Sequence, residues 1–254
     1  MQLKFIGTGS GKTSLKRFHS SILFENDKNI LIDTGDGISK ALLKQNISWN
    51  LIDVIIITHF HADHIAGLPS LLTQMIIDKR TKPLKLYTHI KLVSILENFL
   101  QETFLFPNTF SFELSIIGFT SKTKTDISEN FSFIAKQNSH ITNKHNLKNL
   151  NLAFISASFL FNINDKKIIY TSDIGNKTDL SLFENRNIDY FITETTHISI
   201  PDLEEHILKH NFKSVILTHV SDNEEVKLRN FAVRLENTFN KNVILAEDGM
   251  ILPL

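Results

Sequence analysis

Short apolar runs separated by turns dominate the first quarter of the chain. Residues 3–6, 22–24 and 30–32 each have the length and apolar content of a β-strand, and the polar turn between the last two predicts a hairpin. Residues 54–57 form a continuous apolar run, which is typical of a strand buried on both faces. A helical apolar pattern follows over residues 65–77. The pattern therefore predicts strands that alternate with helices.

The rest of the chain has a strand-rich middle and a last quarter in which strands and helices alternate again. Residues 110–170 are mostly strand-like, because apolar and polar positions alternate in parts of this stretch. No repeat, low-complexity tract or linker interrupts the chain. We therefore expect a single α/β domain over residues 1–254, with two sheets flanked by helices in four αββα layers. Further short elements are expected at residues 37–45, 84–87, 190–192, 201–210, 215–217, 224–237 and 243–245.

The composition narrows the classes of function. Basic and acidic residues number 27 each, so no net charge favours nucleic acid or an anionic membrane. The absence of cysteine excludes disulfides, thiolate metal sites and cysteine nucleophiles. No apolar run is long enough to span a bilayer and the start does not resemble a signal peptide, so a cytoplasmic protein is expected. The 11 histidines are then the most informative feature.

Residues 7–13, Gly-Thr-Gly-Ser-Gly-Lys-Thr, differ from the phosphate-binding loop of nucleotide triphosphatases. That motif needs four residues between its first glycine and the Gly-Lys pair, and this segment has three. No helical pattern follows, so no helix N-terminus is expected to point at a phosphate. We interpret the segment as a turn after the first strand. Lys12 and Arg17, with Lys16 between them, are weak candidates for contacts to a substrate phosphate.

The strongest chemical signal lies in residues 58–64, Thr-His-Phe-His-Ala-Asp-His, directly after a buried strand. His59 and His61 project to the same side at a strand end, while Asp63 and His64 fall at the start of the next helix. Such a segment can supply ligands to two adjacent metal ions. A solvated polar loop explains one or two histidines, but not four ligand-type residues at this spacing.

A two-metal site needs further ligands, and the candidates again follow predicted strands. Asp173 ends an apolar strand with a carboxylate that can bridge two cations, and His219 repeats the pattern of a strand followed by Thr-His. His140 follows another strand, and His145, deeper in a polar loop, is the alternative for the same position. Strand ends lie at one rim of a sheet sandwich, where these side chains can converge.

Residues 59–64 resemble the H-x-H-x-D-H motif of the metallo-β-lactamase-fold hydrolases. Residues 5–10, 31–35 and 65–69 narrow the resemblance to the branch that contains ribonuclease Z and the PhnP-type phosphodiesterases. The resemblance covers nearly the whole chain and implies a four-layer αββα sandwich of the metallo-β-lactamase type. The family's later metal motifs are matched, in order, by His140, Asp173 and His219.

The resemblance also implies how metal ions are held. It implies two divalent ions, with zinc expected for a histidine-rich site and manganese or iron as alternatives. Asp173 would bridge the ions, and Asp63 would be both a ligand and a catalytic residue. Asp33 would orient a ligand histidine from behind the metals, with a simple turn aspartate as the alternative. The other ligands would be His59, His61 and His140 on one ion, and His64 and His219 with Asp63 on the second.

Residues 194–197, Glu-Thr-Thr-His, are the next informative segment. In ribonuclease Z and PhnP-like enzymes, a histidine at about this distance before the last metal histidine is thought to act at the leaving group. The resemblance implies that His197 protonates a departing alkoxide, because imidazole titrates near neutrality. Glu194 would orient His197 or would be a strand-end charge, and a cap on the following helix is the alternative for His197. On that helix, a solvated face is expected to carry His206 and His210.

Two divalent ions suit phosphodiester hydrolysis by a shared hydroxide, and nearly as well the hydrolysis of esters, lactones or thioesters. Ribonuclease Z resembles this chain but carries a long Gly/Pro-rich arm that grips tRNA, whereas the stretch from His140 to Asp173 has only the length of a strand hairpin. We therefore expect a phosphodiesterase for small or cyclic substrates, with no membrane partner and, as is usual among relatives, a homodimer. The alternatives are a lactonase or thioesterase, a tRNA 3′-processing endonuclease without the usual arm, and a metal-binding sensor without turnover.

Overall fold

The computed structural model describes residues 1–142, 152–183 and 187–254, which form two compact units. The first unit contains Met1–Thr120 and Glu247–Leu254, and the second contains Ser121–Ala246. In the described residues, each unit has a mixed sheet of seven strands together with helices. None of the helices in these ranges is long and apolar enough to cross a membrane.

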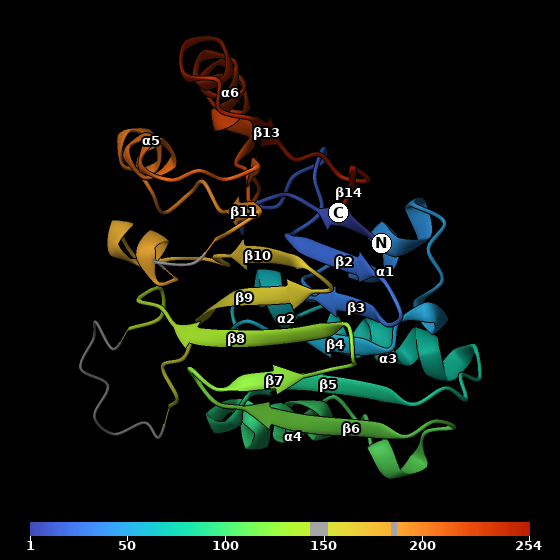
Figure 1. Cartoon of the computed structure of the whole chain (residues 1–254). Helices are drawn as coiled ribbons and strands as arrows, with labels where there is room; N and C mark the ends of the chain where they lie inside the picture. Colours follow the sequence, from blue (N-terminus) through green and yellow to red (C-terminus); the bar gives the residue numbers. More distant parts are fainter. Residues whose placement is uncertain (143–151, 184–186) are drawn as a thin grey trace. The chain divides into compact units, whose positions relative to one another are not determined.

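The sheet of the first unit is antiparallel at one edge and parallel at the other (Figure 1). In sheet order its strands are β14 (Ile251–Pro253), β1 (Gln2–Gly7), β2 (Ser21–Glu25), β3 (Asn29–Ile32), β4 (Val54–Ile56), β5 (Leu84–His89) and β6 (Leu114–Phe119). Strands β3 to β6 are parallel to one another. The carboxyl ends of β3 and β4 therefore lie at the same edge, where Asp33 follows β3 and the histidine-rich segment follows β4.

Helices of the first unit bury their apolar sides against this sheet. They are α1 (Ile38–Lys44), α2 (Ala62–Ile65), α3 (Leu68–Ile77) and α4 (Val93–Glu102). Leu42 of α1, Leu72 of α3 and Leu96 of α4 are fully buried in the same apolar core as Leu31 of β3 and Ile55 of β4. Removal of this apolar area from water stabilises the two strands whose ends carry the candidate site.

A buried arginine, Arg80, fastens the loops at the opposite end of these strands. Arg80 is 3% exposed, and its guanidinium donates to carbonyl groups of the segments that lead into β4 and β5. Burial lowers the pKa of Arg80, while the charge of Asp53 opposes this effect. The donor–acceptor distances are 2.6–3.2 Å, and the acceptors are the carbonyl oxygens of Trp49, Asn50, Ile52, Lys82 and Pro83.

Replacement of Arg80 by alanine is expected to destabilise the protein by about 3 kcal/mol, because several carbonyl oxygens lose their donor at once. Urea unfolding followed by circular dichroism measures the change in the free energy of unfolding. Arg229→Ala is the matched control, since Arg229 forms an exposed helical pair with Glu225 and should cost less than about 0.5 kcal/mol. Equal losses in the two variants would show that the carbonyl contacts of Arg80 contribute little.

In the second unit, the strands follow one another across the sheet in sequence order (Figure 1). They are β7 (Lys124–Asp126), β8 (Phe131–Gln137), β9 (Ala157–Ile163), β10 (Lys166–Tyr170), β11 (Tyr190–Thr193), β12 (Ser214–Leu217) and β13 (Val243–Leu245). Because β9 is antiparallel to both β8 and β10, these two run in the same direction as β11 and β12. The carboxyl ends of all four lie at one edge and are followed by His140, Asp173, Glu194 and His219, respectively.

Two helices of the second unit, α5 (Ile200–Lys209) and α6 (Glu225–Phe239), share an apolar core with the sheet. Ile207 of α5 and Leu235 of α6 are fully buried in the same core as Phe191 of β11 and Leu217 of β12. The core holds β11 and β12 in place, and these strands lead into Glu194 and His219.

The expectation of a solvated face on α5 is wrong for His206. This residue is 7% exposed, and its ring centroid lies 5.0 Å from that of Phe191 and 4.3 Å from that of His210. Position 206 lies three residues after the buried Leu203, on the side of the helix that contacts the core.

Most of the predicted strands are confirmed, whereas two helices differ from the prediction. The helix expected over residues 65–77 begins only at Leu68, as α3, and is separated from the preceding short helix α2 at Gly67, whose N–H donates to the carbonyl oxygen of Thr34. The hydrophobic pattern did not predict α4, in which Leu96 and Leu100 are the fully buried residues.

Candidate metal centre

The histidine-rich segment of the first unit follows β4 directly. His59 is fully buried, and its ring centroid lies 4.8 Å from that of His61 and 4.0 Å from that of His64. Asp63 Oδ2 lies 3.4 Å from His64 Nε2. As predicted, Asp63 and His64 belong to the first turn of a helix, α2. The four ligand-type side chains of the segment are therefore close together.

Asp33 supports this segment from the end of β3. Its Oδ1 accepts a hydrogen bond from Thr58 N at 2.8 Å, and its Oδ2 accepts one from Thr58 Oγ1 at 2.9 Å and lies 2.8 Å from His64 Nδ1. Since the Thr58 hydroxyl donates to Asp33, it can accept from His59 Nδ1, which is 3.0 Å away. Burial raises the pKa of the Asp33 carboxyl, and His64 and Thr58 oppose this rise. With these Nδ1 atoms engaged, Nε2 is the nitrogen that His59 and His64 would offer to a metal ion.

The glycine-rich turn after β1 borders Asp63. A side-chain carbon on Gly11 would lie 3.0 Å from Asp63 Oδ2, and the next residue, Lys12, is exposed. Arg17 is buried, and its Nη1 donates to Thr8 Oγ1. Lys12 is therefore exposed next to a residue that borders Asp63, whereas the contact of Arg17 holds the turn to the end of β1. The substrate-binding role of both residues stays a prediction.

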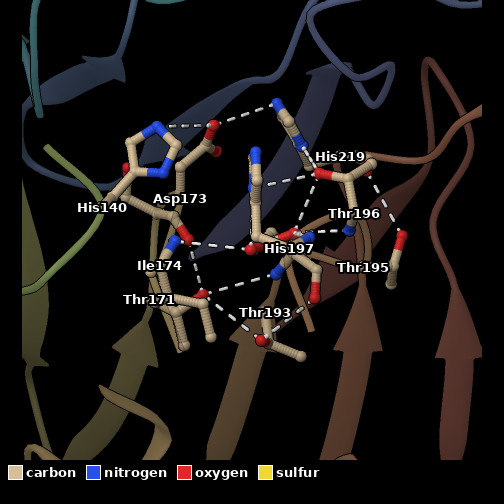
Figure 2. A network of polar contacts seen from close by, with 12 residues as sticks. His140, Thr171, Asp173, Ile174, Thr193, Thr195, Thr196, His197 and His219 are labelled. Carbon is tan, nitrogen blue, oxygen red and sulfur yellow. Dashed lines mark hydrogen bonds and ion pairs between the residues drawn. The ribbon is translucent and has the colours of Figure 1, made fainter. Parts of the chain in front are cut away.

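In the second unit, His140, Asp173 and His219 meet at the strand-end edge (Figure 2). His140 Nε2 lies 3.6 Å from Asp173 Oδ2, and His219 Nε2 lies 3.3 Å from the same oxygen. Asp173 and His219 are buried, and His140 is partly buried. One carboxylate oxygen is therefore close enough to each of the two imidazole nitrogens to bind the same metal ion as either of them. His145, the alternative to His140, lies outside the described residues.

Left-handed backbone occurs after three strands, one in the first unit and two in the second, that lead into candidate residues. Asp33 has a φ of 61°, Ser172 of 52° and His219 of 53°. Non-glycine residues adopt this conformation uncommonly, and such residues concentrate at functional sites. The conformation turns the chain directly after β3, β10 and β12, where the candidate residues follow.

His197 lies beside two of the candidate ligands (Figure 2). Its ring centroid is 4.7 Å from that of His140 and 5.9 Å from that of His219. Its Nδ1 lies 3.1 Å from Oε1 of Glu194, which is 1% exposed and also accepts from His197 N. His197 does not cap helix α5, since Ser199 Oγ accepts from the N–H of Asp202 there.

His197 is also close enough to the candidate ligands to be one itself. Its ligand atom lies within 4.8 Å of those of His140 and Asp173 in one group, and of Glu194 and His219 in another. The distances alone therefore leave two roles for His197, a metal ligand and a proton donor. Measurement of metal content in a His197 variant separates them.

Thr196 contacts a candidate ligand, although the sequence did not indicate this residue. Its Oγ1 lies 3.0 Å from Glu194 Oε2 and 2.9 Å from His219 Nδ1 (Figure 2). One hydroxyl therefore connects a buried carboxylate to a candidate ligand and turns His219 Nε2 toward Asp173. The available signal was the position of Thr196 between Glu194 and His197, which by itself does not indicate a contact to His219.

The candidate ligand atoms suit a divalent metal ion that accepts both nitrogen and oxygen ligands. The first unit presents three imidazoles and a carboxylate in residues 59–64, and the second presents two imidazoles and the Asp173 carboxylate, all without thiolates. Imidazole nitrogen and carboxylate oxygen bind zinc, manganese and iron. The residues of each unit therefore suit such an ion, while the donor types do not select one of these metals.

Comparison with known proteins shows the family. The family described as Anti-Pycsar protein Apyc1 matches residues 1–233 of the chain. The chain belongs to this family. Anti-Pycsar protein Apyc1 of Bacillus phage BSP38 is 28% identical to it, and the match covers 88% of this chain and 90% of the phage protein. Ribonuclease Z of Methanococcus maripaludis is 34% identical over 139 residues, 52% of this chain, but the match covers only 44% of the ribonuclease.

Solved structures show the fold. The metallo-β-lactamase-fold protein YhfI of Bacillus subtilis has a TM-score of 0.75 at 18% identity, with 99% of this chain and 98% of YhfI covered. Human tRNase Z, short form, has a TM-score of 0.73 at 20% identity, with 100% and 99% covered. A diphosphatase from the PhnP family has a TM-score of 0.69 at 18% identity, with 100% and 97% covered.

These findings decide several of the predictions. The metallo-β-lactamase-type α/β fold and the resemblance to the ribonuclease Z and PhnP branch are confirmed. The expectation of a metal-dependent hydrolase agrees with the names of two structural neighbours, a tRNase Z and a diphosphatase. The number and identity of the ions and the role of each ligand stay predictions.

Proposed function

We propose that this protein is a binuclear metal-dependent phosphodiesterase that acts on small or cyclic phosphodiesters. The observation that carries the proposal is the carboxylate of Asp173, which has one oxygen within 3.6 Å of imidazole nitrogens of both His140 and His219. A carboxylate in such surroundings can serve two ions at once. Because the family match runs across both units, we further propose that they work as one hydrolase domain, residues 1–254.

The proposed centre contains two divalent ions, with zinc as the expected metal and manganese or iron as alternatives. Bound ions of this kind lower the pKa of a coordinated water to about 7 and neutralise charge on the phosphate. The order of the motifs along the chain supports the ligand assignment of the family. In this assignment Asp173 would be shared by the two ions, His59, His61 and His140 would hold one ion, and Asp63, His64 and His219 would hold the other.

Residues around the ligands orient them and supply a proton. Asp33 holds His64 through Nδ1, which directs Nε2 toward the metal. Glu194 Oε1 lies 3.1 Å from His197 Nδ1, and this contact fixes the imidazole ring. His197 Nε2 then presents a proton to the leaving oxygen of the substrate. Lys12 is exposed and follows Gly11, which borders Asp63, and it is the proposed contact for a phosphate oxygen of the substrate.

Two features support a small substrate. Between His140 and Asp173 the described residues form mainly β9 and β10, and the chain has as many acidic as basic residues. An RNA held without remote contacts cannot use distant binding energy to position the scissile bond. The phage relative Apyc1 aligns over most of both chains, whereas the ribonuclease Z match is partial.

A homodimer stays a prediction, which size-exclusion chromatography with light scattering tests.

Side-by-side kinetics at physiological salt test the proposed substrate class. We expect kcat/KM for a cyclic nucleotide or a bis-ester to exceed that for a 3′-extended tRNA at least about 100-fold, because the small substrates need no remote contacts. Activity should vanish after chelation and return with zinc or manganese.

Other outcomes identify the alternatives. Efficient tRNA cleavage would replace the proposal with a tRNA 3′-processing endonuclease. Faster turnover of lactones or thioesters would indicate that class of hydrolase. Two bound metal ions without turnover of any phosphodiester, lactone or thioester would indicate a metal-binding sensor.

A further inference from the structure

A buried carboxylate, Asp179, fastens the two loops that carry His140 and Asp173. Its Oδ2 accepts hydrogen bonds from Ser139 N at 3.1 Å, from Ser139 Oγ at 2.7 Å and from Gly175 N at 2.9 Å. Asp179 is 6% exposed and lies in a 3-10 helix shortly after β10. It therefore joins a residue next to His140 with a residue two positions after Asp173.

Asn138 connects the same loops through a second set of contacts. Its Nδ2 donates to the carbonyl oxygen of Asp173 at 2.9 Å and to Ser158 Oγ at 3.0 Å. Its Oδ1 accepts from the N–H of His140 at 3.1 Å. Asn138 is also buried, so water competes little for these hydrogen bonds. The backbone of both candidate ligands is thus held by one amide side chain.

The two loops are in direct backbone contact. A side-chain carbon on Gly175 would lie 2.3 Å from the carbonyl oxygen of Ser139, so only glycine allows this approach. The side chains of His140 and Asp173 are 3.6 Å apart, which is longer than a hydrogen bond. Their separation is therefore set by the loops, and the loops are joined by Asp179 and Asn138.

We propose that Asp179 is a positioning residue that, together with Asn138, sets the separation of His140 and Asp173 and thereby the metal affinity. The inference rests on the proposed function, because it requires these two residues to be metal ligands. Charge also contributes, since an ionised carboxylate accepts stronger hydrogen bonds than a neutral group and Asp179 accepts three. Loss of the carboxylate should let the two loops move apart and weaken the joint ligation.

Titration of the metal-free protein with Co²⁺, followed by its visible absorption, tests this role without substrate. Asp179→Ala should lower the affinity for the weaker-bound Co²⁺ at least about tenfold, the usual cost of removing support from a ligand. Asp179→Asn keeps an acceptor oxygen and should recover much of the loss. Asp189→Ala is the matched control, since Asp189 accepts from Lys167 N at the opposite end of β10 and should leave Co²⁺ affinity unchanged.

Several outcomes would overturn the inference. Unchanged Co²⁺ affinity in folded Asp179→Ala would do so, as would equal losses in the Asp179→Ala and Asp189→Ala variants. If Asp179→Ala does not fold, Ser139→Ala removes one of the three donors and should lower the affinity about two- to fivefold. Unchanged affinity in that variant would also contradict the role. A wild-type protein that binds no Co²⁺, Zn²⁺ or Mn²⁺ would instead contradict the proposed function itself.

Discussion

Asp173→Ala is expected to reduce the metal content from about two ions per chain to less than one and to lower phosphodiesterase activity at least about 1,000-fold. The reason is that the Asp173 carboxylate has one oxygen within 3.6 Å of imidazole nitrogens of both His140 and His219, so it would serve both ions. Elemental analysis of the purified protein gives the metal content. Kinetics on bis-p-nitrophenyl phosphate give the activity.

Asp165→Ala is the control for the loss of a carboxylate in the same unit. Asp165 lies in the exposed turn between β9 and β10 and pairs with Lys166, so metal content and activity should stay at the wild-type level. Thermal unfolding shows whether both variants are folded. Full metal content in folded Asp173→Ala would exclude the bridging role, and loss of one ion with retention of the other would assign Asp173 to a single metal.

The candidate metal residues could be proposed from the sequence because the relevant signals are local. Residues 59–64 directly follow a buried strand and contain His59, His61, Asp63 and His64. One short segment therefore combines a structural pattern with a chemical one. Asp173 and His219 likewise stand directly after apolar runs that prove to be β10 and β12. Within each sheet, parallel strands then place such residues at one edge, so a position in the chain predicts a position in space.

The supporting contacts could not be predicted in the same way, because they join segments that are far apart in the chain. Asn138 contacts the carbonyl group of Asp173 across 35 positions, and Asp179 contacts Ser139 across 40. Neither residue belongs to a motif, and a buried polar side chain looks like a loop residue until its acceptor or donor is known. Thr196 is similar, since its contact to His219 spans 23 positions.

His206 is a residue for which a local sequence pattern predicted the wrong environment. Its charged neighbours on α5 indicated a solvated face, but the apolar stripe of Leu203 and Ile207 includes position 206. Histidine is intermediate in hydrophobicity, so the pattern around it is ambiguous when the helix is short. Packing against Phe191 and Phe212 decides the orientation, and those residues lie outside the helix.

His197→Ala is expected to lose activity selectively on substrates with poor leaving groups. An alkyl phosphodiester releases an alkoxide that needs a proton, and loss of the donor should reduce kcat about 100- to 10,000-fold. A p-nitrophenyl ester releases a stable phenolate, so its hydrolysis should fall less than about tenfold. Steady-state kinetics of one variant on both substrates measure the difference. The structural basis is the His197 ring, which is partly exposed while its Nδ1 lies 3.1 Å from the buried Glu194 carboxylate.

Metal analysis of the same variant separates the two roles that the distances allow for His197. A proton donor leaves both ions in place when it is removed, whereas a ligand takes metal with it. His210→Ala, which removes a histidine at the end of α5, is the matched control and should change neither quantity. Equal losses on alkyl and p-nitrophenyl esters with full metal content would point to substrate binding.

Glu194→Gln should show the same leaving-group selectivity as His197→Ala but a smaller loss of activity, because the imidazole remains and only its charged partner is removed.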